Sequence, residues 1–264
     1  MTLLCIDIGN TNIVFGTYRG RELTAHWRIY TDHNRMPDEY GLLAVNMLQH
    51  DGQDPKDIDA VCIASVVPQL TSWFDEMCRR YFQQIPLVVT AGVKTGVRIR
   101  YDDPRAVGAD RIVNAAATFR KYGGPACVVD FGTGTTFDAI SAEGDYLGGA
   151  IAPGPLLAAE ALFLRAAKLP RIDLARPAKV IGTNPVESMQ SGIFLGYVSL
   201  VEGMVARFRK ELGPNMRVIA TGGLAPMIAA ETTVFEAVDT WLTLDGLRMI
   251  WEMNQEGRKA KDEG

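Results

Sequence analysis

Short runs rich in apolar residues open the chain, and turns that carry glycine or asparagine separate them. Apolar runs bounded by such turns are typical of β-strands. The pattern predicts strands at Leu3–Ile8, Ile13–Tyr18 and Glu22–Ile29. It then predicts a helix over Asp38–Gln49 and a β-branched strand at Ala60–Val67.

The next apolar residues recur at helical spacing. Leu70, Trp73, Phe74, Met77 and Tyr81 lie at offsets of 3, 4, 7 and 11 residues, which places them on one face of an amphipathic helix. The first part of the chain therefore has the order strand, strand, strand, helix, strand, helix.

A Gly/Pro turn at Lys121–Pro125 ends this series, and the same order then begins again. The later elements are predicted as strands at Ala126–Asp130, Thr135–Ser141, Tyr146–Ala152 and Met216–Gly223, and as helices at Leu156–Lys168, Pro185–Leu212 and Trp241–Asn254. We expect two domains, residues 1–122 and 123–255, followed by a charged, frayed tail at residues 256–264.

Two similar segments occur near the starts of the two halves, each between apolar strands. The sequence DIGNTN at Asp7–Asn12 matches DFGTGT at Asp130–Thr135, 123 residues later. A further aspartate, Asp138, lies in the strand that follows the second segment. The match indicates an internal duplication.

Both segments have the composition of an anion-binding hairpin. A glycine-rich turn can direct several backbone N–H groups at one point, and small side chains let a large anion approach. An aspartate beside phosphates is favoured where a cation such as Mg²⁺ or K⁺ lies between them. One copy alone is explained as well by a tight turn. Because there are two copies, we interpret them as a phosphate and metal site in a cleft between similar domains.

A third candidate is the segment Gly108–Arg111, where apolar spacing from Ile112 to Phe119 predicts a helix that begins near Ala109 or Asp110. Asp110 alone is explained by the preference of helix N-termini for carboxylates. However, Arg111 adds a cation, and Gly108 lets the backbone approach a ligand. Phosphoryl transfer to an alcohol needs a group that accepts the hydroxyl proton, and Asp110 is a candidate for it.

Two other glycine-rich segments are less specific. Thr221–Pro226 would let a flat ring such as adenine lie against the backbone, and Gly148–Pro155 resembles another approach loop. Ordinary turns explain both almost as well. The sequence has no P-loop, no complete dinucleotide fingerprint, no nucleophile elbow and no H-E-x-x-H motif.

Composition narrows the function classes. The net charge of −4 with scattered Lys and Arg disfavours nucleic-acid binding. No membrane span or signal peptide is expected, since no apolar run reaches about 18 residues. A cytoplasmic location is therefore expected. The four cysteines lack metal-ligand spacing, and Cys5, Cys62 and Cys127 lie in apolar strand-like runs, which indicates buried reduced thiols. The three histidines are expected at the surface.

The chain resembles the type III pantothenate kinases, a branch of the acetate and sugar kinase, Hsp70 and actin superfamily, over essentially its whole length. The motifs that carry the resemblance are Asp7–Asn12, Gly108–Arg111, Asp130–Thr136, Gly148–Gly154, Met189–Gly192 and Thr221–Gly223. The resemblance implies an α/β fold of duplicated actin-like (ribonuclease H-like) domains with a cleft between them. It also implies a homodimer whose active site is completed at the interface.

The implied reaction is ATP-dependent phosphorylation of pantothenate to 4′-phosphopantothenate, the first step of coenzyme A biosynthesis. Asp110 would be the general base, Asp7 would lie near Mg²⁺, and Asp130 would hold K⁺ or ammonium. The implied ATP-binding residues are Asp7, Ile8, Gly9, Asn10, Thr11, Asn12, Ile13, Val14 and Thr133. The implied pantothenate-binding residues are Tyr101, Gly108, Ala109, Asp110 and Arg111.

One position departs from the family pattern. Pro185 stands where the family has a threonine expected to touch substrate. The substrate hydrogen bond of that threonine, worth about 0.5–1.5 kcal/mol, is therefore not carried over to this chain, and the position is not counted as a site. Locally, Asn184 can cap the helix, Pro185 can be its first residue, and Glu187 can provide the reciprocal cap.

Two alternatives remain open from the sequence. Similar proteins that are not enzymes act as transcription accessory factors, but the presence of Asp7, Asp110 and Asp130 favours an enzyme. A kinase of the same fold acting on a sugar or a short carboxylic acid is the second alternative, because Arg111 suits any anionic substrate.

Overall fold

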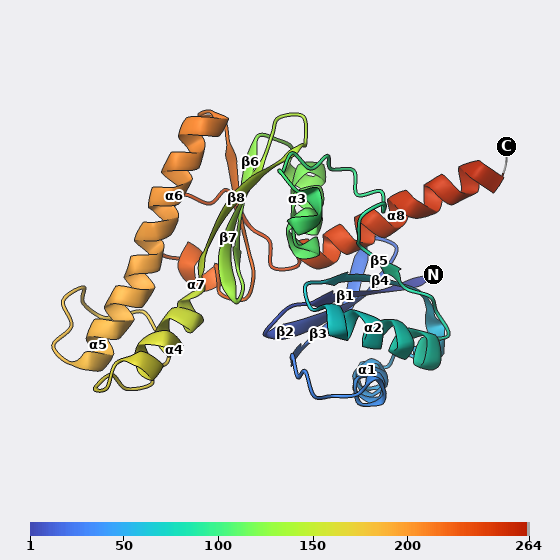
Figure 1. Ribbon diagram of the computed structural model, residues 1–264, viewed down its shortest axis with the longest axis horizontal. Helices are drawn as coiled ribbons and strands as arrows, with labels where there is room; N and C mark the ends of the chain where they lie inside the picture. Colours follow the sequence, from blue (N-terminus) through green and yellow to red (C-terminus); the bar gives the residue numbers. More distant parts are fainter. Residues whose placement is uncertain (263–264) are drawn as a thin grey trace. The chain divides into compact units, whose positions relative to one another are not determined.

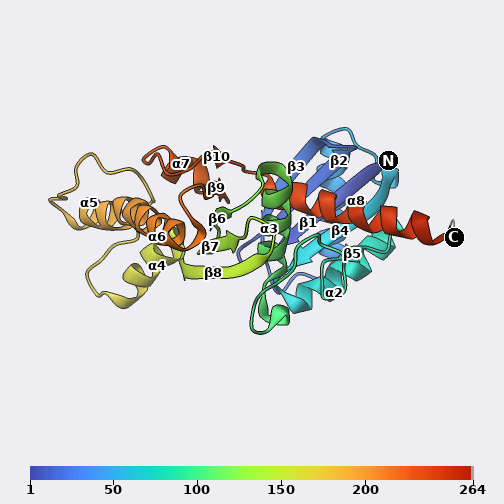
Figure 2. The same cartoon turned by 90° about the horizontal axis from the view of Figure 1, so that it is seen from above.

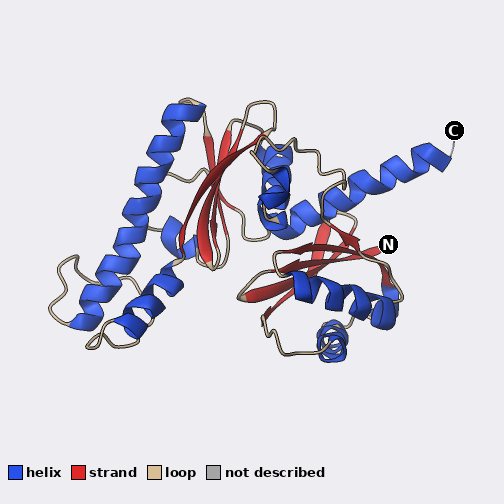
Figure 3. Ribbon diagram, in the orientation of Figure 1, coloured by secondary structure: helices blue, strands red, loops and turns tan. Residues whose placement is uncertain are grey.

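Two compact units make up the chain. The computed structural model describes the backbone of residues 1–262 and the side chains of residues 1–255. The first unit comprises Met1–Arg98, Asp102–Ala117 and the segment from Leu242 onward, and the second comprises Ile99–Tyr101 and Thr118–Trp241. Figure 1 follows the chain through each unit, and Figure 3 distinguishes its helices from its strands.

The first unit is built on a five-stranded mixed sheet with the order β3-β2-β1-β4-β5. Its strands are β1 (Thr2–Ile8), β2 (Asn12–Arg19), β3 (Glu22–Tyr30), β4 (Ile58–Ser65) and β5 (Leu87–Val88). The first three form an antiparallel meander, and β4 and β5 then pair in parallel. The sequence therefore predicted the main strands correctly and missed only the two-residue β5.

Helices cover both faces of this first sheet. The helical elements of this unit are α1 (Pro37–His50), η1 (Pro55–Asp57), α2 (Pro68–Met77), the π-helical η2 (Cys78–Phe82), η3 (Pro104–Ala106), α3 (Ala109–Tyr122) and α8 (Leu242–Asp262). The end of α3, from Thr118 onward, is counted with the second unit. Leu4, Ile6 and Ile8 of β1 pack in one core cluster with residues of α1 and α2. The alternate residues of β1 point to the other face, where α8 lies. In Figures 1 and 2, α8 and α2 lie on opposite sides of this sheet.

The second unit repeats the first sheet, with five strands in the order β10-β9-β6-β7-β8. Its strands are β6 (Ala126–Phe131), β7 (Gly134–Ile140), β8 (Tyr146–Pro153), β9 (Arg217–Thr221) and β10 (Ala237–Val238). Here too an antiparallel meander continues into two parallel pairings. The same order and the same strand senses confirm the predicted duplication.

The helices of the second unit are α4 (Pro155–Arg165), α5 (Pro185–Gln190), the π-helical η4 (Ser191–Leu195), α6 (Gly196–Leu212) and α7 (Ala225–Ala229). The run from Pro185 to Leu212 is long and apolar enough to cross a membrane by length and composition. Its apolar residues, among them Phe194, Val201 and Val205, instead pack in the core against β6 and β7. This run is therefore the core helix of an α/β unit.

The contacts divide the chain differently from the predicted boundary at residues 122 and 123. Helix α8 belongs to the first unit, because a side chain on Gly246 would come within 2.5 Å of Val113 O, and Leu244 lies against Gly16 of β2. The backbone of this helix continues through Asp262, across residues 256–262 of the predicted tail. Residues 263 and 264 lie outside the described part of the chain.

Candidate active site

The strand pair β1–β2 places Asp7 at the mouth of the first repeated turn. Asp7 pairs with Val14 across the ladder, and Gly9 N–H donates a hydrogen bond of 3.0 Å to Asn12 O to close the turn. A Cβ atom on Gly9 would lie 3.0 Å from that same oxygen. The turn is therefore tight, and only glycine fits its first position without a shift of the backbone.

The residues of this hairpin differ in what they can offer a ligand. The side chains of Ile8 and Ile13 are buried in the core, so only their backbone groups are available. Asn10 and Asn12 are exposed, and Asp7, Thr11 and Val14 are partly buried. The hairpin thus presents amide, hydroxyl and carboxylate groups over a rigid apolar base.

Thr31, which follows β3, holds the turn in place. Its hydroxyl donates a hydrogen bond of 2.7 Å to Gly9 O, and its backbone N–H donates one of 2.9 Å to Thr11 O. Thr31 is only 2% exposed, so both bonds are protected from water. Sequence reasoning missed Thr31, because a single threonine after a strand carries no motif.

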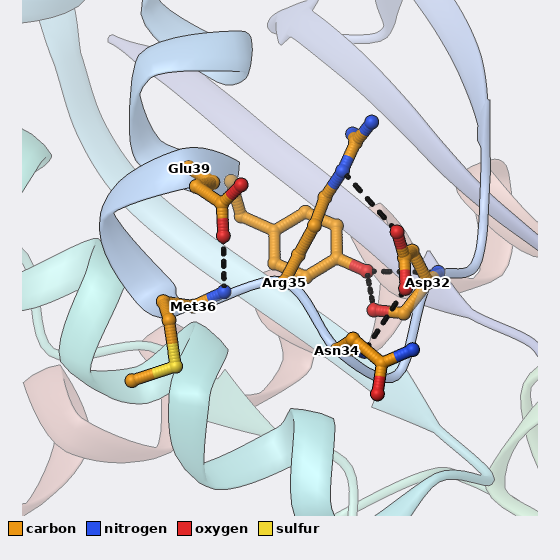
Figure 4. Close-up of polar contacts among 6 residues, drawn as sticks. Asp32, Asn34, Arg35, Met36 and Glu39 are labelled. Atoms are coloured by element: carbon orange, nitrogen blue, oxygen red, sulfur yellow. Dashed lines mark hydrogen bonds and ion pairs between the residues drawn. The ribbon is translucent and has the colours of Figure 1, made fainter.

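The loop after Thr31 is itself fixed to α1. The Tyr40 hydroxyl donates to Asp32 O at 2.7 Å and accepts from Asp32 N–H at 3.1 Å (Figure 4). Asn34 N–H donates to the Asp32 carboxylate, and Glu39 accepts from Met36 N–H at the start of the helix (Figure 4). These bonds connect the hairpin, through Thr31, to a buried tyrosine of the core.

The second hairpin has the same design with one residue fewer. Asp130 pairs with Thr136, six positions on, whereas Asp7 pairs with Val14, seven positions on. Gly132 N–H donates to Gly134 O at 3.0 Å. The repeated aspartates therefore correspond as predicted, but the match slips by one residue after the turn.

Two other glycine motifs meet the second hairpin. A Cβ atom on Gly222 would lie 2.5 Å from Asp130 Oδ1, and one on Gly154 would lie 2.4 Å from Thr133 O. Gly154 N–H donates to that same oxygen, and α4 begins directly after it. The TGG segment and the end of the GGAIAPG segment thus lie against Asp130 and Thr133, and the N-terminal end of α4 starts beside the turn.

Each repeated aspartate fits a cation that takes one carboxylate from the protein and its other ligands from water and substrate phosphates. Among the described residues, no three His, Cys, Asp or Glu side chains gather as a metal cluster. A single carboxylate suits Mg²⁺, which is held by one or two carboxylates, waters and substrate phosphates. Asp7 and Asp130 therefore fit metals that bind together with a phosphate ligand.

Asp110 lies at the start of α3, folded back over the preceding turn. Arg111 N–H donates a hydrogen bond of 2.8 Å to Asp110 Oδ1, and a Cβ atom on Gly108 would lie 2.5 Å from that oxygen. Burial raises the pKa of the Asp110 carboxyl above its usual value, although the Arg111 N–H and guanidinium oppose the shift. A carboxylate with a raised pKa is a better proton acceptor, as a general base requires.

Val66 connects this turn to the first hairpin. Its backbone N–H donates to Ile8 O at 3.1 Å, and its Cγ1 lies 3.3 Å from where a Cβ atom on Gly108 would be. The first unit therefore brings the DIGNTN and GADR segments to the same residue.

Tyr101, the remaining predicted substrate residue, belongs to the second unit. Its ring lies 6.4 Å from that of Tyr146 and is 40% exposed. Gly148 lies under the ring, because a Cβ atom there would be 3.4 Å from Tyr101 Cε2. Sequence reasoning missed Tyr146, which no motif distinguished from other strand residues.

The helix after the Pro185 substitution is capped largely as predicted. The Asn184 side chain accepts from Glu187 N–H at 3.0 Å, and Pro185 is in the first turn. The Glu187 carboxylate bonds Thr183 N–H and hydroxyl rather than the backbone of Asn184. Pro185 is therefore compatible with a well-formed α5.

Comparison with known proteins agrees with the sequence motifs. A family model described as type III pantothenate kinase matches residues 3–207. A type III pantothenate kinase from Roseiflexus castenholzii is 54% identical over 254 residues, covering 96% of this chain and all of that protein. Another from Moorella thermoacetica is 53% identical over 252 residues, covering 96% and 99% of the two chains.

The solved structures share the fold at low sequence identity. A Baf family transcriptional activator from Campylobacter jejuni has a TM-score of 0.62 at 18% identity, covering 96% of this chain and 99% of its own. An activator of 2-hydroxyisocaproyl-CoA dehydratase from Clostridium difficile has a TM-score of 0.55 at 11% identity, covering 99% of this chain and 98% of its own. Together with the two matching sheets, these structures confirm the predicted fold of duplicated actin-like α/β domains. Together with the family match and the relatives at more than 50% identity, these findings establish that the chain belongs to the type III pantothenate kinase family.

Proposed function

We propose that this protein transfers the γ-phosphoryl group of ATP to the terminal hydroxyl of pantothenate, which is the first step of coenzyme A biosynthesis. Relatives at 53–54% identity over nearly the whole chain carry the name of this activity. The observation that carries the proposal within the molecule is Asp110, a carboxylate of raised pKa at a helix start beside Arg111.

In the proposed reaction, the hydroxyl oxygen of pantothenate forms a bond to the γ-phosphorus of ATP. Asp110 accepts the proton that this hydroxyl group loses. The bond between the γ-phosphorus and the β–γ bridging oxygen breaks, and ADP leaves with that electron pair. Arg111 supplies positive charge for an anionic substrate. Gly108 gives the Asp110 carboxylate room to fold back over the turn, and Gly108 and Ala109 are proposed to contact the substrate through their backbone.

Each repeated hairpin is proposed to bind phosphate groups of ATP. In the first hairpin, the backbone groups and turn side chains of Asp7 to Val14 would bind the nucleotide. In the second hairpin, Thr133 would bind it. Mg²⁺ beside Asp7 and K⁺ or ammonium beside Asp130 would neutralise phosphate charge when bound. The single carboxylate in each hairpin and the glycines packed around Asp130 support this assignment.

A direct assay tests the proposal. Purified protein with ATP and Mg²⁺ should release ADP when pantothenate is added, and not when a sugar or a short carboxylic acid replaces it. Rates in potassium or ammonium buffer should exceed those in sodium buffer. ADP release with a sugar but not with pantothenate would refute the assignment, and equal rates in sodium and potassium would refute the cation site.

A non-catalytic role is the second candidate, since a Baf family transcriptional activator shares the fold. Asp7, Asp110 and Asp130 are all retained in this chain, which favours the enzyme. The net charge of −4 and the absence of a basic stripe weigh against contact with nucleic acid. We also propose a cytoplasmic location, because all four cysteines are free and buried.

The proposed homodimer has a candidate surface on the second unit. Nine large hydrophobic side chains between Leu147 and Val186 are exposed, with Leu164 at 65% and Ile181 at 82%. They belong to β8, α4, the segment that leads into α5 and the first turn of α5, and Figures 1 and 2 place α4 beside α5 and α6. Exposed large hydrophobic side chains on neighbouring elements are candidates for an interaction surface.

Substitution of Leu164 or Ile181 by Glu should convert a dimer to a monomer in sedimentation velocity experiments. Ile85→Glu is the matched control, because Ile85 is 72% exposed but belongs to the first unit. A monomeric wild-type protein, or dimers of unchanged affinity in both variants, would refute the surface.

A further inference from the structure

The segment before Tyr101 is attached to the edge of the second sheet. Ile99 forms a parallel bridge with Tyr146, and Arg100 N–H donates a hydrogen bond of 2.8 Å to Tyr146 O. The Arg100 side chain donates from Nε to the Asp145 carboxylate at 2.9 Å. These contacts fix the backbone that leads into Tyr101.

A β-bulge interrupts β8 at this point. Ile140 pairs with Tyr146, but Ala139 pairs with Gly148, so Leu147 is an extra residue on β8. We call Tyr146–Gly148 the β8 bulge. Gly148 has a φ of +116°, a conformation that other residues rarely adopt. Bulges redirect side chains and are frequent next to active sites.

The β8 bulge supports the Tyr101 ring from two sides. The Tyr146 ring is fully buried and lies at 47° to that of Tyr101, with centroids 6.4 Å apart. A methyl group on Gly148 would lie in van der Waals contact with Tyr101 at 3.4 Å, and any residue other than glycine would be strained at this φ. Tyr101 nevertheless keeps 40% of its surface exposed to a ligand.

Asp138 holds the Tyr146 ring in place through its hydroxyl group. This carboxylate is fully buried and accepts hydrogen bonds from the Tyr146 hydroxyl at 2.9 Å and from the Thr136 hydroxyl at 3.0 Å. Tyr146 therefore cannot rotate without the loss of a buried hydrogen bond.

We propose that Tyr146 and Gly148 are positioning residues that hold the Tyr101 ring ready for pantothenate. The inference rests on the proposed contact between Tyr101 and pantothenate. A ring held in place before binding loses less conformational entropy when the substrate arrives. The β8 bulge therefore sets the affinity for pantothenate and leaves that for ATP unchanged.

The experiment compares Tyr146→Phe and Gly148→Ala with Tyr101→Ala. Tyr146→Phe keeps the ring but removes its bond to Asp138, and Gly148→Ala adds a methyl group under Tyr101. Each substitution should raise the KM for pantothenate about 2- to 10-fold, which corresponds to the free energy of one aromatic contact. The KM for ATP should stay unchanged. In a Tyr101→Ala background, neither change should raise the pantothenate KM further.

Gly213→Ala is the control for backbone strain. Gly213 has a φ of +98° and nothing within 4 Å of an added Cβ atom. The Gly213→Ala substitution should leave the pantothenate KM unchanged. The inference would be overturned if Tyr146→Phe or Gly148→Ala raised the pantothenate KM as much in the Tyr101→Ala background as in the wild-type protein. It would also be overturned if Gly213→Ala raised this KM as much as Gly148→Ala does. If Tyr101→Ala itself leaves the pantothenate KM unchanged, the proposed contact fails, and the inference fails with it.

Discussion

The backbone N–H of Arg111 donates a hydrogen bond of 2.8 Å to Oδ1 of Asp110, the candidate base. This bond and the Arg111 guanidinium favour the ionised carboxylate, but burial outweighs them and raises the Asp110 pKa. The group is therefore held ready to accept a proton at a cost in stability, as is common in active sites.

Asp110→Asn should lower kcat about 10²- to 10⁴-fold, because the hydroxyl proton then has no acceptor. In the wild-type protein, kcat/KM should fall as pH drops through the raised pKa of Asp110, at a higher pH than an ordinary carboxyl would give. A coupled ADP-release assay across pH measures both. Undiminished turnover in Asp110→Asn would rule out the base.

The same shift predicts the sign of a stability change. Between the usual carboxyl pKa and the raised one, the folded state binds more protons than the unfolded state, so stability falls as pH rises through this window. The Asp110→Asn variant should not lose stability as pH rises through this window. Its Tm at neutral pH should equal or exceed that of the wild-type protein. Asp75→Asn, at an exposed ion pair with Arg79, is the control and should change stability little.

Gly222→Ala should disturb the Asp130 carboxylate, because the added Cβ would lie 2.5 Å from its Oδ1 and 2.7 Å from the Phe131 backbone. We expect loss of most activity and a lower Tm. Gly213→Ala has a comparable positive φ with open space around it, so it should cost only about 1 kcal/mol of strain. Equal activity in both variants would show that the Gly222 contact with Asp130 does not matter.

Tyr40→Phe should destabilise the protein by about 1–3 kcal/mol, since it removes both bonds between the buried Tyr40 hydroxyl and the Asp32 backbone. Urea unfolding measures the change. Tyr81→Phe is the matched control, because the Tyr81 hydroxyl bonds the half-exposed Asp38 carboxylate and its loss should cost about 0.5 kcal/mol or less. Similar losses in both variants would contradict the argument.

The repeated hairpins were predictable because their signal is local. Apolar strands that end in aspartate and turn through glycine specify both the elements and the side chain at the turn, and β1–β2 and β6–β7 have that form. The start of α3 near Asp110 followed from helical spacing in the same way. Local chemistry therefore located the candidate site before any tertiary contact was known.

Long-range packing was not predictable from these patterns. Helical spacing identified α8 but not the sheet it covers, since Leu244 meets Gly16 across more than two hundred residues. Tyr146 likewise reads as an ordinary strand residue, and only the β8 bulge and the buried Asp138 give it a role. Such residues act through contacts that their own sequence neighbours do not reveal.

Thr31→Val tests how strongly the first turn depends on one buried hydroxyl. The change keeps the side-chain shape but removes the 2.7 Å bond to Gly9 O, so the turn of Gly9 to Asn12 loses one of its two anchors at this residue. We expect the KM for ATP to rise about 5- to 10-fold, as the loss of about 1 kcal/mol of hydrogen bonding implies. The KM for pantothenate should stay the same.

Thr17→Val provides the comparison, because Thr17 is also buried on the first sheet and its hydroxyl bonds Thr24, far along β2 from the turn. Both variants should lose similar stability, yet only Thr31→Val should weaken ATP binding. An equal rise of the ATP KM in both would mean that general destabilisation, and not the shape of the turn, controls nucleotide binding. An unchanged KM in Thr31→Val would mean that the Thr31 backbone bond to Thr11 O is sufficient to hold the turn.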